Sequence, residues 1–251
     1  MDLAAGEHVE LSGKADCLDA EQVNELCANI NSADTICSLH ISFNNLTIYN
    51  RDDSILFKAN STNIILINLH FYNGLSVAIS SIGQLKDQFE TVKRVKVENI
   101  VYKNTLHAVY FKTWTNNQNS YPPNSGGGGL GYVSNMLFKD LATTSLRGSA
   151  VAISQYTWFS RAPGKGNCTN LQFQIWDIMV ANLHRTTKSE HVTSFQCSAV
   201  VPCTNIGVFR VDLEFVNGMK AEEYLYGNVK NPRGFVCTGA VCKGGSVTGE
   251  Y

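Results

Sequence analysis

The chain has 251 residues, with 20 basic and 21 acidic side chains and a formal net charge of -1. Because no basic cluster stands out, this composition argues against a nucleic acid or an anionic membrane as partner. No apolar run approaches the roughly 18 residues that a membrane-spanning helix needs. The polar start MDLAAGEHVE also lacks the apolar core of a signal peptide. A neutral or sugar-like ligand stays open.

Residues 1–30 differ in pattern from the rest of the chain. The segment DAEQVNELCANI places Ala20, Val23, Cys27 and Ile30 on one helical stripe, and its start resembles a capping box. It predicts a short helix, which we expect to cap the first coil of a solenoid whose strand edges would otherwise be exposed. A plain surface helix is the alternative.

From about residue 42 onward, short apolar-alternating segments return, each with Asn or Asp near its middle and a turn after it. The centres of four of them lie roughly 30 to 40 residues apart, at Asn68, Asn99, Asp140 and Asp177. Val, Ile, Leu and Phe at period two indicate strands. A repeat of this length cannot bury its apolar row alone, so the pattern predicts a stack of coils.

An all-β parallel β-helix fits this pattern best, and a β-sandwich with similar strands is the alternative. No linker divides the repeats, so we expect a single domain over residues 1–251, with coils from residue 31.

Eight cysteines and three N-x-T acceptors suit an oxidising, glycosylating compartment. The spacing in CSAVVPC predicts a disulfide between Cys197 and Cys203, and CTGAVC predicts one between Cys237 and Cys242. Zinc is a weaker interpretation, because tight C-x-x-C hairpins with nearby histidines are absent. The glycosylation candidates are Asn45, Asn60 and Asn167.

The pair Asp52 and Asp53 in NRDDS is a weak signal when taken alone. Aspartate is common in turns because its side chain accepts hydrogen bonds from nearby backbone N–H groups. Local evidence therefore favours a structural turn.

Several segments in one order resemble glycoside hydrolase family 28, the polygalacturonases and rhamnogalacturonan hydrolases, most of all its fungal exo-acting members. NINSADT is similar to the family's N-T-D-G-x-D-T, NRDDS to G-D-D-C, and NGLSVAISSIGQL to G-H-G-I-S-x-G-S-x-G-Q. VYFKTW stands for the family's R-I-K segment, and YPPNSGGGGLGYVSN for the Gly-rich loop of the exo-acting branch.

The resemblance implies a right-handed parallel β-helix and inverting, exo-type hydrolysis of pectin, either galacturonan or rhamnogalacturonan. It implies no metal and no cofactor, and a protein that acts as a monomer outside the cell on a polysaccharide. An inverting hydrolase needs one carboxylic acid to protonate the leaving oxygen and a carboxylate to draw a proton from water.

Carried over by position, the resemblance gives Asp52 the role of the general acid and Asp53 that of one water-activating carboxylate. The other water-activating aspartate is replaced by Asn31, whose amide can hydrogen-bond water but cannot take its proton. Losing a positioned base typically costs about 10²- to 10⁴-fold in rate.

Three positions of the implied substrate site lie around the loop NGLS and the strand VYFKTW. Leu75 replaces the family's histidine, and Tyr110 replaces its arginine, while Lys112 is kept. Tyrosine offers one hydroxyl and a face for stacking, whereas arginine grips a carboxylate with a planar fork. Lys112 is then the main cation for a galacturonate carboxylate.

Two functions follow from this partial set. The first is a pectin-degrading hydrolase with impaired activity, in which Asp52 and Asp53 act and Lys112, Tyr110 and Asn31 bind substrate. The second is an inactive homologue that binds pectin or a protein partner without cutting.

Overall fold

The computed structural model describes residues 8–12, 18–19, 32–36, 38–114, 127–159, 171–239 and 247–248. Every strand pairing between its named strands is parallel, and the strands form two sheets. In these ranges no residue is helical, and therefore no helix is long and apolar enough to cross a membrane.

The first sheet holds the odd-numbered strands except β5, and those from β1 to β17 lie in chain order. Its members are β1 (His8–Ser12), β3 (Ser32–Ile36), β7 (Ile55–Phe57), β9 (Val77–Ile82), β11 (Val109–Trp114), β13 (Val151–Phe159), β15 (His191–Gln196), β17 (Glu223–Gly227) and β19 (Val247–Thr248), which pairs with β13.

The second sheet holds the longer strands. Its members are β2 (Leu18–Asp19), β4 (Ser38–Leu39), β8 (Ser61–Tyr72), β10 (Phe89–Lys103), β12 (Leu130–Leu146), β14 (Gln174–Thr187), β16 (Cys203–Glu214) and β18 (Val229–Lys230), with β5 (Ser42–Asn44) and β6 (Thr47–Tyr49) paired to β8.

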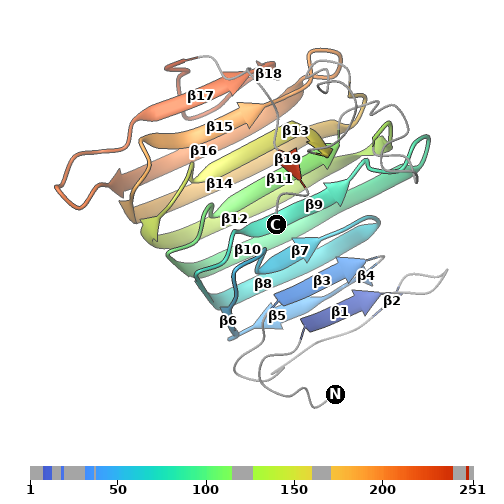
Figure 1. Cartoon of the computed structure of the whole chain (residues 1–251), viewed down its shortest axis with the longest axis horizontal. Coiled ribbons are helices and arrows are strands. Elements are labelled where there is room, and N and C mark those ends of the chain that lie inside the picture. Colours follow the sequence, from blue (N-terminus) through green and yellow to red (C-terminus); the bar gives the residue numbers. More distant parts are fainter. Residues whose placement is uncertain are drawn as a thin grey trace.

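The chain alternates between the two sheets, so that one strand of each makes a coil and the coils stack as rungs (Figure 1). The core lies between the sheets, in rows of apolar side chains that repeat from coil to coil. One fully buried row contains Phe43, Leu66, Val97, Phe138, Val180 and Val208. Each side chain in such a row packs on its neighbours above and below, as a solenoid requires. The predicted all-β parallel β-helix is confirmed.

The long strands of the second sheet are bent at regular intervals by residues with left-handed backbone. Asn68, Asn99, Asp140 and Asn182 all have φ between 56° and 58° and lie in register on four successive strands. Asn and Asp adopt this conformation more readily than other non-glycine residues. The recurrent Asn and Asp of the sequence repeat therefore mark the corners of the coils.

The fourth predicted repeat centre was wrong by one corner. Asp177 does not align with Asp140; it lies five residues before Asn182, in a neighbouring column with Asn135 and Asn205. Both columns have left-handed backbone and carry Asn or Asp, so residue type alone does not separate them.

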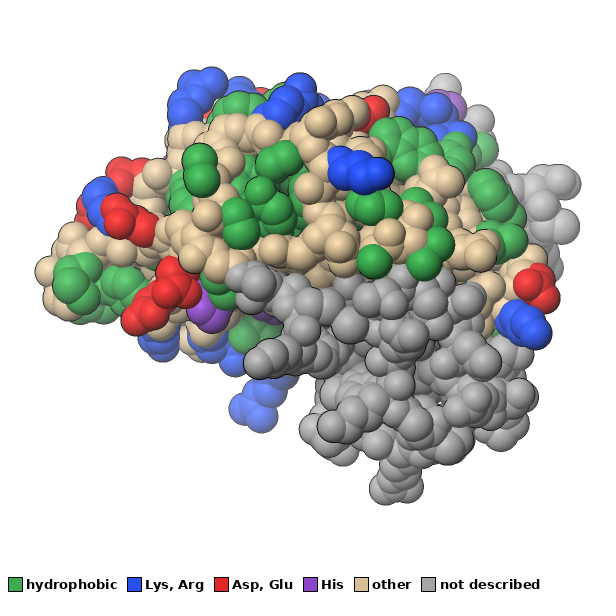
Figure 2. Space-filling model, turned by 90° about the horizontal axis from the view of Figure 1, so that it is seen from above, with side chains coloured by type: hydrophobic (Ala, Val, Ile, Leu, Met, Phe, Trp, Pro, Cys, Tyr) green, Lys and Arg blue, Asp and Glu red, His purple; other side chains and the backbone are tan. Residues whose placement is uncertain are grey.

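The last coil is covered less completely than the others. Its apolar side chains are only partly buried against the core, namely Val211, Phe215, Tyr224, Tyr226, Val229 and Phe235. Figure 2 looks down on the face at the top of Figure 1, where β17 and β18 lie, and shows hydrophobic side chains at the surface among polar ones. The connection from β16 to β17 projects at the left of both views. Lys220 in this connection forms ion pairs with Asp212 and Glu214 of β16.

The predicted N-terminal helix covers residues 19–30; residues 20–30 lie outside the described residues, and Asp19 belongs to the short strand β2. The single-domain organisation stays a prediction.

Candidate active site

The two adjacent aspartates lie in the turn between β6 and β7. Asp52 is exposed, and its Oδ1 accepts a hydrogen bond from the backbone N–H of Asp53 at 2.8 Å. Asp53 is almost completely buried, and its Oδ1 accepts from the Ser76 hydroxyl at 2.6 Å. Asp52 thus shapes the turn as the local pattern predicts, while the Asp53 carboxylate is held by the next coil.

The loop NGLS anchors this turn from the following coil. The N–H of Leu75 donates to the backbone carbonyl of Asp52 at 2.9 Å, and the N–H of Ser54 donates to the carbonyl of Ser76 at 2.8 Å. A Cβ added at Gly74 would lie 2.9 Å from the carbonyl oxygen of Asp52 and 2.7 Å from Ser54 Oγ, too close for either. Glycine at position 74 therefore lets the two turns touch.

Leu75 contributes through its backbone. Besides the bond to Asp52, its carbonyl accepts from the N–H of His107 at 2.7 Å, so this residue links three successive coils. The side chain that replaces the family's histidine leaves this backbone connection intact.

A pocket of about 310 Å³ lies on the outer face of the first sheet, over β7, β9 and β11. We call it the carboxylate pocket; its lining residues are Asp52, Asp53, Leu56, Lys58, Ser80, Gln84 and Lys112. The structure thus brings Lys112 into one pocket with Asp52 and Asp53, which precede it in the chain by 60 and 59 residues. The pocket contains two lysines and two aspartates. The lysines suit an anionic ligand, and the aspartates lie in the same pocket.

Lys112 is largely buried, with 8 % of its surface exposed. Its Nζ lies 5.7 Å from the centre of the Tyr110 ring, within reach of a cation–π interaction. A buried ammonium is costly unless it is paired, and Lys112 lines the same pocket as Asp52 and Asp53. Lys112 and Tyr110, both predicted to bind substrate, therefore contact each other.

Four residues of the carboxylate pocket were not predicted from the sequence, namely Leu56 and the polar residues Lys58, Ser80 and Gln84. Leu56 on β7 pairs with Ala78 on β9, so Lys58 and Ser80, each two residues further on, lie near the same level of the sheet. Ser80 and Gln84 stand within the segment NGLSVAISSIGQL, although its resemblance gave them no role. For Lys58 the sequence signal is alternation along its strand, because outward positions recur every second residue.

A buried glutamate positions the loop that carries Gln84. Glu90 Oε2 accepts from the N–H of Gly83 at 2.8 Å, and burial raises the pKa of Glu90. A Cβ at Gly129 would lie within 2.6 Å of the Gly83 carbonyl carbon, so the Gly-rich segment packs directly on this loop. Glu90 was also not predicted, since its role depends on a contact across the turn after β9.

A second, smaller pocket of about 110 Å³ lies on the other side of β11. We call it the hydroxyl pocket; its lining residues are His107, Tyr110, Ser149, Ala152, Ile153, Ser154, Ser194 and Gln196. The rings of His107 and Tyr110 lie 4.9 Å apart. The sequence analysis assigned His107 no role in a site, whereas the structure places it beside a predicted substrate residue.

His107 is held in one neutral form. Its Nδ1 lies 2.6 Å from the carbonyl oxygen of Ser149, which requires Nδ1 to carry the proton and donate it. Burial lowers the pKa of His107 to about 4, with smaller contributions from the positive charges of Arg147 and Lys112. Above that pH, Nε2 is an acceptor.

The predicted Cys197–Cys203 disulfide is present, with a Cα–Cα distance of 5.7 Å. The predicted Cys237–Cys242 bond is not formed, because Cys237 is an exposed free thiol whose Sγ lies 3.0 Å from the Gly239 carbonyl oxygen. Its intended partner, Cys242, lies outside the described residues.

Other predicted residues are placed as follows. Asn45 and Asn60 are exposed corner residues with φ of 57° and 62°, and their glycosylation stays a prediction. Asn31 and Asn167 lie outside the described residues. The structure therefore places four of the five predicted catalytic and substrate-binding residues, and those four line two adjoining pockets.

The fold and the site together define a parallel β-helix protein with acidic and basic side chains in a pocket on one outer face. The family model described as glycosyl hydrolases family 28 matches residues 9–233. The chain belongs to this family.

Curated relatives and a solved structure agree with this assignment. An α-L-rhamnosidase, rgxB, of Aspergillus niger is 52% identical over 222 residues, which are 88% of this chain and 51% of the relative. A putative galacturan 1,4-alpha-galacturonidase A of Aspergillus flavus is 26% identical over 80% of this chain and 49% of its own. The crystal structure of an endo-xylogalacturonan hydrolase from Aspergillus tubingensis superposes with a TM-score of 0.68 at 21% identity, covering 85% of this chain and 54% of that one.

The chain spans about half the length of the curated relatives it matches.

Proposed function

We propose that this chain carries the catalytic face of a pectin-degrading glycoside hydrolase that inverts the anomeric centre. The observation that supports it is the convergence of Asp52, Asp53 and Lys112 on the carboxylate pocket. The two aspartates come from one turn and Lys112 comes from β11, two coils further on, and a structural turn alone does not require the lysine. The similarity to a rhamnosidase and to a galacturonidase supports pectin as the substrate class.

In this proposal each side chain has one task. Asp52, which is exposed to solvent, protonates the leaving glycosidic oxygen as general acid. Asp53, oriented by the Ser76 hydroxyl, accepts a proton from the attacking water. Lys112 pairs with a uronate carboxylate in the same pocket.

The proposal includes reduced activity. Asn31 stands where the family has a second water-activating aspartate, so Asp53 has to act as base alone. We expect a rate about 10²- to 10⁴-fold below that of a chain with the full set. Tyr110 in place of arginine removes a bidentate carboxylate contact and leaves Lys112 with most of that task.

The same replacements favour a second candidate function, a protein that binds pectin fragments or a protein partner without cutting. Asn31, Leu75 and Tyr110 each remove a group that acts in catalysis in the family, whereas the carboxylate pocket itself remains. Binding requires the pocket and not the missing base.

Release of reducing sugar from polygalacturonate and rhamnogalacturonan separates the two functions. The native chain is compared with Asp52→Asn, which keeps size but cannot donate the proton, and with Asn31→Asp, which restores the family's carboxylate. Activity in the native chain that Asp52→Asn abolishes supports the hydrolase. Activity only in Asn31→Asp, with binding by the native chain, supports the binding protein.

We also propose that the protein works outside the cell as a monomer and needs no cofactor. The disulfide Cys197–Cys203 supports an oxidising compartment. Analytical ultracentrifugation of the purified chain measures its mass in solution and so tests whether it is a monomer.

A further inference from the structure

A pocket of about 720 Å³ lies on the outer face of the second sheet, over β5, β8, β10 and β12. We call it the second-sheet pocket, and the lining residues that carry its chemistry are Ser42, Asn63, Ile65, Arg94, Lys96 and Leu137. None of its described lining residues belongs to the carboxylate pocket or to the hydroxyl pocket. Its volume lies within the roughly 300–1,000 Å³ typical of small-molecule sites. It is therefore a separate candidate site.

One outward row of side chains runs along this pocket. Ser42, Ile65, Lys96 and Leu137 lie in register on four neighbouring strands, and Met179 on β14 continues the row. Ile65 and Met179 are 39% and 37% exposed, so aliphatic side chains of one row meet solvent. From Ile65 to Leu137 the row spans two strand spacings, or roughly 10 Å. Contiguous apolar surface with a polar rim is typical of an interaction site.

Arg94 places a guanidinium beside this row. It is an exposed corner residue of β10, and its Nε donates a hydrogen bond to Asn63 Oδ1 on β8 at 2.5 Å. The four N–H donors on its two Nη atoms have no hydrogen-bond acceptor among the described residues. Because a guanidinium is planar and rigid, the bond at Nε also fixes the plane in which the Nη groups can bind a carboxylate.

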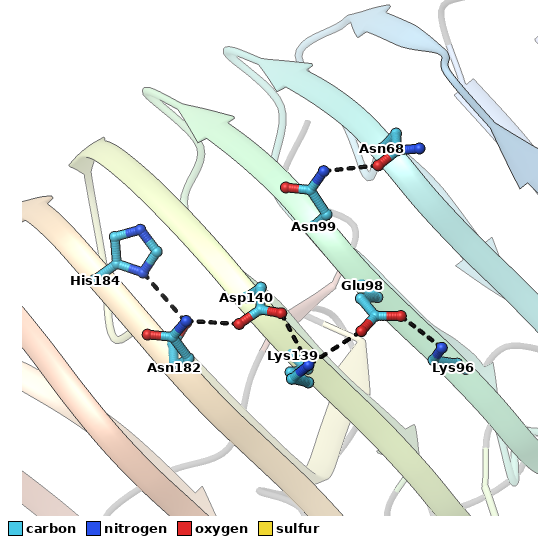
Figure 3. Close-up of polar contacts among 8 residues, drawn as sticks. All are labelled: Asn68, Lys96, Glu98, Asn99, Lys139, Asp140, Asn182 and His184. Atoms are coloured by element: carbon cyan, nitrogen blue, oxygen red, sulfur yellow. Dashed lines mark hydrogen bonds and ion pairs between the residues drawn. The ribbon is translucent and has the colours of Figure 1, made fainter.

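The charges around the second-sheet pocket leave Arg94 as its main cation. Lys96 Nζ lies 2.5 Å from Glu98 Oε2, and Lys139 reaches the same carboxylate at 3.2 Å (Figure 3). Lys96 is thus already paired, and it contributes its methylene stem to the row. Within the described part of the chain, no Asp or Glu lines the pocket and none forms an ion pair with Arg94. An anionic ligand would therefore meet a cation and no opposing carboxylate.

The aliphatic row decides what else such an anion would carry. Ile65 and Leu137 have no hydrogen-bonding side-chain groups, and the described lining contains no aromatic ring apart from the His40 imidazole. Sugar hydroxyls placed on this surface would lose hydrogen bonds to water, which is costly. An apolar group placed there is stabilised, because apolar surface is removed from water on both sides. The pocket thus suits one anionic group attached to an apolar body.

We propose that the second-sheet pocket binds a small organic acid whose carboxylate pairs with Arg94 and whose apolar body lies on Ile65, the Lys96 stem and Leu137. An arylalkyl carboxylate has this chemistry, whereas a uronate does not, because hydroxyls cover its ring. The site binds its ligand on the other sheet from the proposed hydrolase site, and it does not depend on that proposed function.

The test titrates the full chain in a calorimeter with phenylpropanoate, with the neutral phenylpropanamide and with galacturonate. We expect phenylpropanoate to bind with a dissociation constant below about 1 mM, and about 10-fold more tightly than phenylpropanamide. Galacturonate should not displace it. Absence of saturable phenylpropanoate binding, equal binding of the amide, or displacement by galacturonate overturns the proposal. None of these results bears on the hydrolase, which is tested by sugar release.

Two substitutions remove the two halves of the site separately. Arg94→Gln removes the charge, and we expect it to weaken phenylpropanoate binding about 10-fold. Ile65→Ser removes apolar contact and should weaken binding by about 5-fold or more. Both side chains are exposed, so neither change alters the core. If both variants bind phenylpropanoate as tightly as the parent, the probe binds elsewhere and the proposal is overturned.

Arg210→Gln is the matched control for the charge. Arg210 on β16 is also an exposed corner arginine, with φ 53° against 54° for Arg94, and it lies outside the second-sheet pocket. The substitution removes the same charge from the same backbone conformation, so phenylpropanoate should bind this variant as it binds the parent. A loss of affinity equal to that of Arg94→Gln would trace the effect to net charge and overturn the assignment of the pocket.

Discussion

The outer faces of the two sheets carry polar side chains in very different arrangements. On the second sheet, charged and amide groups contact one another: Lys139 lies 3.2 Å from Glu98 and 3.1 Å from Asp140, and Asn182 donates to Asp140 at 2.6 Å (Figure 3). On the first sheet, the carboxylate pocket gathers acidic and basic side chains around a hollow.

The difference separates scaffold from site. The polar side chains of the second sheet run along the stack and join coil to coil, as Asn99 does by donating to Asn68 at 2.7 Å (Figure 3). Those of the first sheet include Asp53 and Lys112, which are both nearly buried. Burial of a charged group costs free energy, so its presence beside a pocket is a stronger sign of function than an exposed ion pair.

The largest expected effect comes from the core that both faces share. Phe138 is fully buried in the row between the sheets, and Phe138→Ala removes most of its side chain. We expect a loss of about 3–5 kcal/mol in the free energy of unfolding. Urea denaturation followed by circular dichroism measures it. A loss below about 1 kcal/mol would show that the coils do not depend on one another as a stacked core requires.

The next effect belongs to the first sheet and depends on pH. The folded pKa of His107 is about 4, below the usual 6.5, so between these values the unfolded chain binds a proton that the folded chain does not. Stability from this residue is therefore present above pH 6.5 and is lost as the pH falls to about 4, by at most roughly 3 kcal/mol.

His107→Phe keeps a ring but cannot titrate, so it should flatten this part of the stability profile. Urea midpoints at several values between pH 4 and 7 compare the two chains. If the native chain and His107→Phe lose stability in parallel over this range, His107 is not the buried group that titrates.

A smaller effect is expected on the second sheet, at a corner of the coils. Asn99 has φ 57°, and Asn99→Ala places a Cβ in the left-handed region that alanine disfavours by about 1–2 kcal/mol. Asn99→Gly removes the same amide without that strain and should cost less. The urea midpoints of the two variants are compared. If the glycine variant is as unstable as the alanine variant, the loss of stability comes from the hydrogen bond with Asn68 and not from backbone strain.

The smallest effect is expected for the exposed ion pairs beside that corner. Hydrogen bonds from Lys96 and then Lys139 lower the pKa of Glu98, but both lysines are well exposed. Glu98→Gln should lower the melting temperature by no more than about 4 °C, and less in 1 M salt. A larger shift that persists in high salt would mean that this network supports the fold more than its exposure suggests.

The sequence predicted the fold because every coil repeats the same requirement. Apolar residues at period two, with a polar residue between them at Asn68, Asn99 and Asp140, can be recognised from the sequence alone. The structure shows that these three polar residues are corners. The fourth corner was assigned to Asp177 instead of Asn182, since two columns of corners carry the same residue types. The strand register decides which Asn stacks on which. Because the coils differ in length, the register cannot be counted from the sequence.

Part of the candidate site was also predictable. Asp52, Asp53 and Lys112 were identified through motifs that a family keeps in order, and the structure places them around one pocket. Lys58 and Glu90 lie in no such motif, whereas Ser80 and Gln84 stand within NGLSVAISSIGQL but were given no role. What brings Lys58, Ser80 and Gln84 to the pocket is position on adjoining coils, and Glu90 acts through a hydrogen bond across a turn.

By itself, then, the sequence determined the stack of parallel coils, because the coil pattern is written in residue types at short spacing, and it predicted an incomplete carboxylate set from a resemblance in motifs. Only the tertiary structure decided that Lys112 and Tyr110 open into two different pockets and that His107 is neutral beside one of them. Charge, burial and hydrogen bonding at those residues come from strands that are distant in the chain, and only packing brings such strands together.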